Sequence, residues 1–351
     1  MRVYDQTIER KENGICGRIN PGFSYRKMIL TGNSLDILKT LKSESINCCV
    51  TSPPYYGLRD YGHDEQIGLE ETPEQYIQKL VEVFREVKRV LKNDGTLWVN
   101  IGDSYAGSGK GGATHPENAG NYKQGTNRGM VGAGATTKVG WGKCKPKDLI
   151  GIPWMLAFAL RADGWYLRQD IIWQKPNPMP ESVTDRCTKS HEYIFLLSKS
   201  RRYYFDNEAT KEPCVNGDPT QPRGSSGTFA PNGGRRGSGN KERKQRPSHE
   251  QINRECQAGS VPWEPKEKRN KRDVWTVSTK PYRGAHFATF PPDLIEPCIL
   301  AGCPENGIAL DPFFGSGTVG VVAEKHNRDW IGIDVNPDYC EIAKNRIATG
   351  K

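Results

Sequence analysis

Residues 308–320 read IALDPFFGSGTVG, and this stretch decides the fold. An apolar run that predicts a strand is followed by glycines in the order G-x-G-x-x-G, starting at Gly315, and then by a helical pattern. A second predicted strand, residues 330–334, ends in Asp334, which lies 19 residues after Gly315. Glycines let a ligand approach the backbone closely, and a carboxylate at the next strand tip can bind ribose hydroxyls. The stretch therefore predicts a Rossmann-like nucleotide site in an α/β protein.

The position of this pattern in the chain limits the kind of nucleotide. Taken literally, the glycines suit a dinucleotide-dependent oxidoreductase, which we keep as a remote alternative. Only 31 residues follow Gly320, too few for the rest of such a sheet, so the missing strands must come from the N-terminal part. Asp311 and Phe313 place a carboxylate and an aromatic ring before the glycines. This arrangement favours an adenosine ligand that has no pyrophosphate.

Strand and helix patterns alternate in the N-terminal part, which implies a mainly parallel sheet. Thr72, Pro73 and Gln75 have the order of an N-cap, a first-turn proline and a capping-box residue, and the helix that they begin is expected to stop at residues 93–95. The predicted strands are residues 28–31, 46–50, 96–101, 165–173, 193–197, 308–311 and 330–334, and the other predicted helices are residues 35–41, 153–162, 293–301 and one that begins near Pro337.

Two segments break the alternation. Residues 106–143 are rich in glycine and poor in apolar residues, so we expect a mobile loop. Residues 206–273 lose the apolar pattern, and within them residues 223–246 hold seven basic residues against one acidic residue. We therefore expect one catalytic domain formed by residues 1–205 and 274–351, interrupted by an irregular basic insertion. A solvated, disordered insertion without a function is the alternative for this segment.

Composition narrows the class of protein. The net charge of +9 and the pI of about 9.0 suit a polyanionic partner such as nucleic acid. No window has the length and apolarity of a membrane span, and the first ten residues lack the apolar core of a signal peptide. The ten cysteines include no CxxC pair, so we expect reduced thiols, no metal site and a cytoplasmic protein, in a prokaryotic cell or a phage-infected host.

Residues 51–55, TSPPY, follow a predicted strand and carry a second chemical signal. Two prolines cannot continue a sheet ladder, because proline has no N–H and a fixed φ. At a strand tip, Ser52 and the carbonyl of Pro53 can point acceptors into a cleft, where they would hold the two protons of an exocyclic amine. Tyr55 can stack on the base that bears this amine, which is worth ~1–3 kcal/mol. A Pro-Pro turn with packing tyrosines is the alternative interpretation.

Together the two motifs resemble those of the DNA amino-methyltransferases that use S-adenosylmethionine. TSPPY is similar to the catalytic motif of that family and DPFFGSGT, residues 311–318, to its cofactor motif; the order, catalytic motif first, is that of the circularly permuted beta group. The resemblance implies a catalytic set of Ser52, Pro53, Pro54 and Tyr55 and a cofactor-binding set of Asn33, Phe290, Asp311, Phe313, Gly315, Gly317, Thr318 and Asp334.

Further blocks support the resemblance, which covers about residues 28–205 and 274–348. Residues 31–36 resemble the segment near the adenine, with Asn33 where the family more commonly has Asp, and residues 286–291 resemble the segment beside the methionine part. Residues 173–177 and 191–199 are similar to two other blocks.

The reaction that the resemblance implies is direct methyl transfer to the amine of a base flipped out of double-stranded DNA. Ser52 favours cytosine N4 over adenine N6, which stays the alternative. The insertion stands where the family has its target-recognition region. A homodimer and a cognate restriction endonuclease are further expected partners. A methyltransferase acting on RNA or a small molecule, and a DNA-binding protein with an inactive fold, are rival hypotheses.

Overall fold

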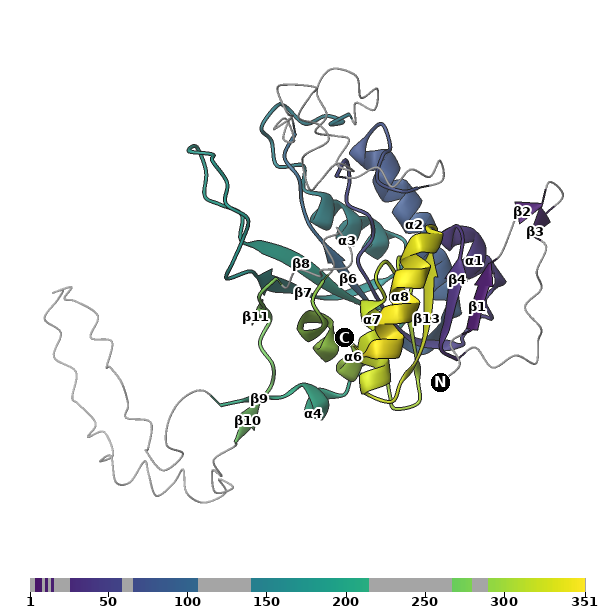
Figure 1. Cartoon of the computed structure of the whole chain (residues 1–351). Coiled ribbons are helices and arrows are strands. Elements are labelled where there is room, and N and C mark those ends of the chain that lie inside the picture. The colour runs from purple at the N-terminus through teal and green to yellow at the C-terminus, as the bar shows by residue number, and fades with distance from the viewer. Residues whose placement is uncertain are drawn as a thin grey trace, which may run out of the picture. The chain divides into compact units, whose positions relative to one another are not determined.

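The computed structural model describes residues 4–7, 10–11, 14–15, 26–58, 66–106, 140–214, 267–279 and 290–350. The chain divides into two compact units, one formed by Met1–Thr210 with Arg272–Lys351 and the other by Lys211–Lys271. The larger unit contains a nine-stranded sheet (Figure 1). No described helix is long and apolar enough to cross a membrane.

The sheet is mainly parallel, as the alternation of strands and helices predicts. Its only antiparallel pairs among the described strands are those that β8 makes with β6 and with β7. The strand order is β1 (Tyr4–Thr7), β4 (Met28–Thr31), β13 (Asp329–Asp334), β12 (Ile308–Asp311), β5 (Ile46–Thr51), β6 (Leu91–Ile101), β8 (His191–Ser198), β7 (Tyr166–Gln174) and β11 (Val274–Thr276).

Helices cover both faces of the sheet, so its central strands are buried on both sides. Successive strand residues point to opposite faces. Leu310 accordingly belongs to the apolar core of α1 (Ser34–Thr40), α2 (Pro73–Val90) and α3 (Ile152–Ala162), whereas Ala309 belongs to that of α6 (Pro292–Gly302), α7 (Thr318–Lys325) and α8 (Pro337–Thr349). This three-layer arrangement, visible in Figure 1, is the Rossmann-like architecture expected from the sequence.

Most predicted elements are confirmed, and the largest shift has a clear cause. The capping box of α2 forms as expected, since the backbone N–H of Gln75 donates to the Thr72 hydroxyl and the Gln75 side chain accepts from the Thr72 N–H. The helix ends at Val90 and not at residues 93–95, and β6 begins at Leu91 and not at residue 96. Leu91 already pairs with Ile46 in the sheet, so strand pairing ends the helix earlier.

Much of the two irregular segments lies outside the described residues, namely 107–139 of the expected loop and 215–266 of the expected insertion. The described ends of the insertion pair with each other. There β9 (Glu212–Pro213) is antiparallel to β10 (Lys268–Arg269), and the Arg269 guanidinium lies 3.0 Å from the Glu212 carboxylate. The remaining short elements are the β2 (Arg10–Lys11) and β3 (Gly14–Ile15) hairpin and α4 (Asn207–Thr210).

One edge of the sheet gathers the polar strand tips. The parallel strands β4, β13, β12, β5 and β6 all end there, and β7 ends and β8 begins at the same edge. Carboxyl ends of parallel strands are where α/β proteins bind ligands. Both motifs singled out in the sequence lie at this edge.

Candidate active site

Thr51 and Asp311 connect the two motifs directly. They end the neighbouring strands β5 and β12, and the buried Thr51 hydroxyl donates to Asp311 Oδ1 at 2.6 Å. The same oxygen accepts the backbone N–H of Phe313 at 3.0 Å, so Asp311 also holds the turn. Burial raises the pKa of this carboxyl to about 7, although both hydrogen bonds oppose the shift. Segment 52–55 is thereby fixed beside the glycine-rich turn.

The glycine-rich turn has an open side. Gly315 has a φ of 49°, a left-handed conformation that favours glycine, and no described atom lies within 4 Å of where its Cβ would be. The Gly315 N–H donates to Asp334 Oδ2 at 2.7 Å, and the Asn336 N–H donates to Oδ1 of the same side chain at 2.9 Å. Both oxygens of the Asp334 carboxylate thus accept backbone N–H groups at the tip of β13. The turn fits an adenosine ligand lying against its backbone.

The other side of the turn packs against α8. A Cβ on Gly317 would lie 2.8 Å from the Cβ of Ala343, so only glycine allows this approach. The buried hydroxyl of Thr318 accepts a hydrogen bond of 2.8 Å from Arg346. Gly317 and Thr318, which the resemblance assigns to the cofactor, thus have contacts that secure the turn to α8.

Asn33 and Phe290, two further residues of the expected cofactor set, lie just before α1 and α6. The Asn33 side chain caps α1, accepting the backbone N–H groups of Leu35 at 3.0 Å and Asp36 at 3.3 Å. The preceding Gly32 donates to the carbonyl of Asp334 at 2.8 Å, which brings Asn33 to the end of β13. Phe290 is partly buried against the core under α6, and residues 286–289 of its block lie outside the described residues.

Residues 52–55, the expected catalytic set, lie outside any helix or strand directly after β5, as two prolines predict. Pro53 is buried, and Ser52, Pro54 and Tyr55 are partly buried. The carbonyl of Pro54 accepts the phenol of Tyr76 at 2.7 Å. Among the described residues outside helices and strands, no backbone N–H donates to the carbonyl of Pro53. That carbonyl remains an acceptor beside Ser52.

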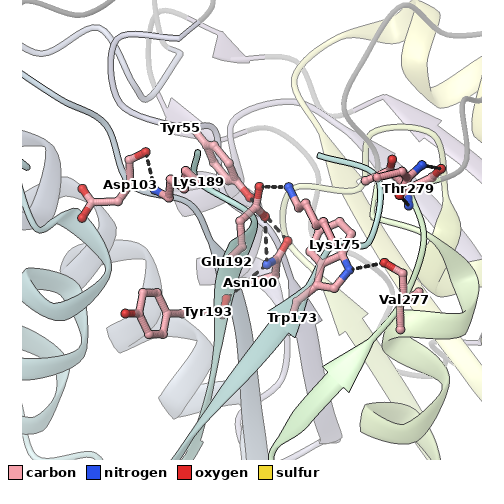
Figure 2. Close-up of polar contacts among 11 residues, drawn as sticks. Tyr55, Asn100, Asp103, Trp173, Lys175, Lys189, Glu192, Tyr193, Val277 and Thr279 are labelled. Carbon is pink, nitrogen blue, oxygen red and sulfur yellow. Dashed lines mark hydrogen bonds and ion pairs between the residues drawn. The ribbon is translucent and has the colours of Figure 1, made fainter. Parts of the chain in front are cut away.

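Tyr55 is held at its hydroxyl (Figure 2). The phenol donates to Glu192 Oε2 at 2.7 Å, and Asn100 Oδ1 lies 3.4 Å from it. Burial raises the pKa of Tyr55 well above its ordinary value; the Glu192 carboxylate raises it further, and a hydrogen bond with Ser52 opposes them. Gly102 lies against the ring, because a Cβ there would be 2.7 Å from Tyr55 Cε2.

Sequence reasoning assigned no role to Glu192 or Asn100. Glu192 falls in a block that resembles the family, but its partner Tyr55 is 137 residues away, and no local pattern connects them. The contact depends on β8 lying between β6 and β7. That strand order, which the alternation of elements does not give, was the missing signal.

The architecture and the edge define a class: a Rossmann-like α/β protein with a nucleotide turn beside an aromatic corner. The chain belongs to the N6/N4 family of DNA methylases, whose profile matches residues 46–345. Membership in this family leaves the dinucleotide-dependent oxidoreductase without support.

Known Type II methyltransferases are similar in sequence to nearly the whole chain. It is 48% identical to the Type II methyltransferase M.Cfr9I of Citrobacter freundii over 91% of this chain and 87% of that one. It is 44% identical to the Type II methyltransferase M.SmaI of Serratia marcescens over 98% and 96% of the two chains.

Solved structures agree on the fold. PvuII DNA methyltransferase, described as cytosine-N4-specific, superimposes with a TM-score of 0.56 at 17% identity, covering 92% of this chain and 93% of that one. A putative DNA modification methylase from Thermus thermophilus, solved in complex with S-adenosyl-L-methionine, gives a TM-score of 0.53 at 20% identity over 93% and 94% of the two chains.

Proposed function

We propose that this DNA methylase transfers the methyl group of S-adenosylmethionine to the exocyclic amine of a base flipped out of double-stranded DNA, and that the base is cytosine, methylated at N4. The observation that carries the proposal is the hydrogen bond between Thr51 and Asp311. It supports a site in which the acceptors of Ser52 and Pro53 lie beside the turn that suits an adenosine ligand. Donor and target would therefore meet at one sheet edge.

The cofactor side uses the open face of the turn. Asp334 would accept the ribose hydroxyls, and the backbone at Gly315 would approach the ligand closely. Phe313, Phe290 and Asn33 complete the proposed contacts. When bound, S-adenosylmethionine supplies an electrophilic methyl group on a sulfonium.

Ser52 and Pro53 prepare the amine. Their oxygen acceptors hold the two amine protons, which directs the nitrogen lone pair towards the methyl group. In this arrangement the nitrogen–carbon bond would form as the carbon–sulfur bond breaks, with the sulfur keeping the electron pair, and the amine would then lose a proton to solvent. Tyr55 stacks on the base and fixes its plane, so positioning supplies most of the rate enhancement. No covalent intermediate with the protein is needed.

Cytosine is favoured by the serine in the motif. The resemblance connects Ser52 with N4 methylation, and PvuII methyltransferase, similar in fold, is described as cytosine-N4-specific. The family includes enzymes for both amines, so adenine N6 is the second candidate.

Target recognition falls to the insertion, residues 206–273. The seven basic residues between 223 and 246 suit phosphate contacts and guanine edges. Because the relatives are Type II methyltransferases, we include a cognate restriction endonuclease in the proposal. A homodimer stays a prediction.

A transfer assay tests this function with a matched pair of variants. Purified protein is incubated with S-adenosylmethionine labelled in the methyl group and with DNA from a host that lacks DNA methylation. Ser52→Ala should lower the transfer rate about 10²-fold while cofactor binding persists. Ser45→Ala, just before the opposite end of β5 and partly buried, should transfer normally. Unchanged transfer in Ser52→Ala would reject the catalytic assignment.

A further inference from the structure

Glu192 lies at the centre of a polar cluster around the Tyr55 hydroxyl (Figure 2). Its Oε2 accepts from the Tyr55 phenol at 2.7 Å and from Asn100 Nδ2 at 3.3 Å. Asn100 is itself oriented by the carbonyl of Tyr193 at 3.1 Å. The phenol therefore meets an acceptor whose own direction is fixed.

Lys175 occupies the other oxygen of Glu192. Its ammonium forms an ion pair with Oε1, and the two side chains are only 19% and 14% exposed. Trp173, the register partner of Glu192 in the neighbouring strand, lies under the lysine with its ring centroid 4.3 Å from Nζ. The indole N–H of Trp173 donates to the carbonyl of Val277, which holds that ring in turn. Such a partner offsets part of the cost of enclosing a carboxylate.

The ring of Tyr55 is thus restrained at both ends. Its backbone belongs to the proline corner, its edge lies against Gly102, and its hydroxyl is bound by Glu192. A stacking platform works best when its plane is set before the base arrives, because the ordering cost is then already met.

We propose that Glu192 is a positioning residue for methyl transfer: it fixes the Tyr55 ring in the plane that receives the flipped base, and the ion pair with Lys175 holds Glu192 in place. The inference rests on the proposed function and adds two residues to it. Stability alone explains the cluster poorly, since enclosed ion pairs add little net stability over apolar residues of similar volume.

A double-mutant cycle distinguishes this role from a structural one. Single-turnover methyl transfer to unmethylated DNA is measured for the wild type, Glu192→Gln, Tyr55→Phe and the double variant. Each single variant should lose about tenfold in rate. The double variant should be no slower than the slower single variant, because Glu192 acts through the phenol that Tyr55→Phe removes.

The control is another ion-paired carboxylate. Glu296, on α6, pairs with Lys325 and His326. Glu296→Gln should leave the rate unchanged, both in the wild type and in the Tyr55→Phe variant. S-adenosylmethionine affinity should be equal in all variants. If Glu192→Gln fails to fold, Glu192→Asp replaces it in the cycle, because it keeps the charge near Lys175 but shortens the reach to the phenol.

Each outcome has a distinct meaning. Losses that multiply to about 10²-fold in the double variant would show that Glu192 acts independently of Tyr55 and would overturn the inference alone. A normal rate in Glu192→Gln would overturn it as well. A wild type that transfers no methyl group to DNA would overturn the proposed function together with the inference.

Discussion

The Thr51 hydroxyl lies 2.6 Å from Asp311 Oδ1, although the two residues are 260 positions apart in the chain. Each ends a strand, and the two strands are neighbours in the sheet. This one contact joins residues 51–55, the proposed catalytic segment, to the strand that leads into the glycine-rich turn. It also shows how the two motifs reach one edge of the sheet, although the proposed catalytic motif comes early in the chain and the proposed cofactor motif comes late.

The charge of Asp311 should be visible in the pH dependence of stability. Its pKa is raised from 3.8 to about 7 by burial, so the folded protein keeps a proton that the unfolded chain loses. Stability from this group is complete below about pH 4 and is lost as the pH rises to about 7, by at most about 4 kcal/mol. Asp311→Asn keeps both hydrogen bonds without the charge. In urea unfolding at pH 4.5 and pH 7.5, the free energy of unfolding of the variant should rise relative to that of the wild type at the higher pH. An equal difference at the two pH values would contradict the assignment.

Two glycines of the turn should separate ligand binding from packing. Gly315 and Gly317 both have positive φ, 49° and 78°, so alanine at either costs a similar strain of about 1–2 kcal/mol. Only at Gly317 does the new Cβ also meet α8, at 2.8 Å from Ala343. Gly317→Ala should therefore lose about 1–3 kcal/mol more in urea unfolding.

Gly315→Ala should fold and yet bind S-adenosylmethionine at least about tenfold more weakly by calorimetry, because its Cβ fills the open side of the turn. Equal stability of the two variants, or full affinity in Gly315→Ala, would contradict this division.

Substitution of Gly102 should affect methyl transfer by displacing the ring of Tyr55. A methyl group there would lie 2.7 Å from Tyr55 Cε2, and the hydroxyl anchored on Glu192 prevents the ring from moving freely. Gly102→Ala should slow methyl transfer about tenfold without loss of cofactor affinity. In a Tyr55→Ala background the same change should cost nothing further. A full cost in that background would mean that Gly102 acts elsewhere.

Removal of the insertion should separate cofactor binding from DNA recognition. The antiparallel pair β9–β10 joins the described ends of the insertion. A short Gly-Ser linker in place of residues 215–266 would therefore keep this strand pair. Cofactor affinity should persist, whereas DNA methylation should fall at least about 10³-fold as specific binding is lost. Undiminished methylation after the removal would assign recognition to another segment.

Replacement of the basic residues between 223 and 246 by glutamine should weaken DNA binding and reduce its salt dependence.

Sequence predicts the elements of this protein better than their contacts. Strands β4 and β12 begin and end where the apolar runs do, because periodicity and turn glycines are local signals. The edge strand β1 has no such run and escaped notice. The capping role of Asn33 is local and was readable from its place before a helix. The Thr318–Arg346 and Tyr55–Glu192 contacts depend on which elements become neighbours, which no short pattern gives.

The most direct test of the account is the identity of the modified base. The protein would be produced in a host that lacks DNA methylation, and that host's DNA would be hydrolysed to nucleosides and analysed by mass spectrometry. We predict N4-methylcytosine, absent from the same host producing the Tyr55→Ala variant. N6-methyladenine would preserve the chemistry at Ser52 and Pro53 and contradict the choice of base. DNA without either modification, from cells containing folded protein, would contradict the proposal that this site methylates a DNA amine.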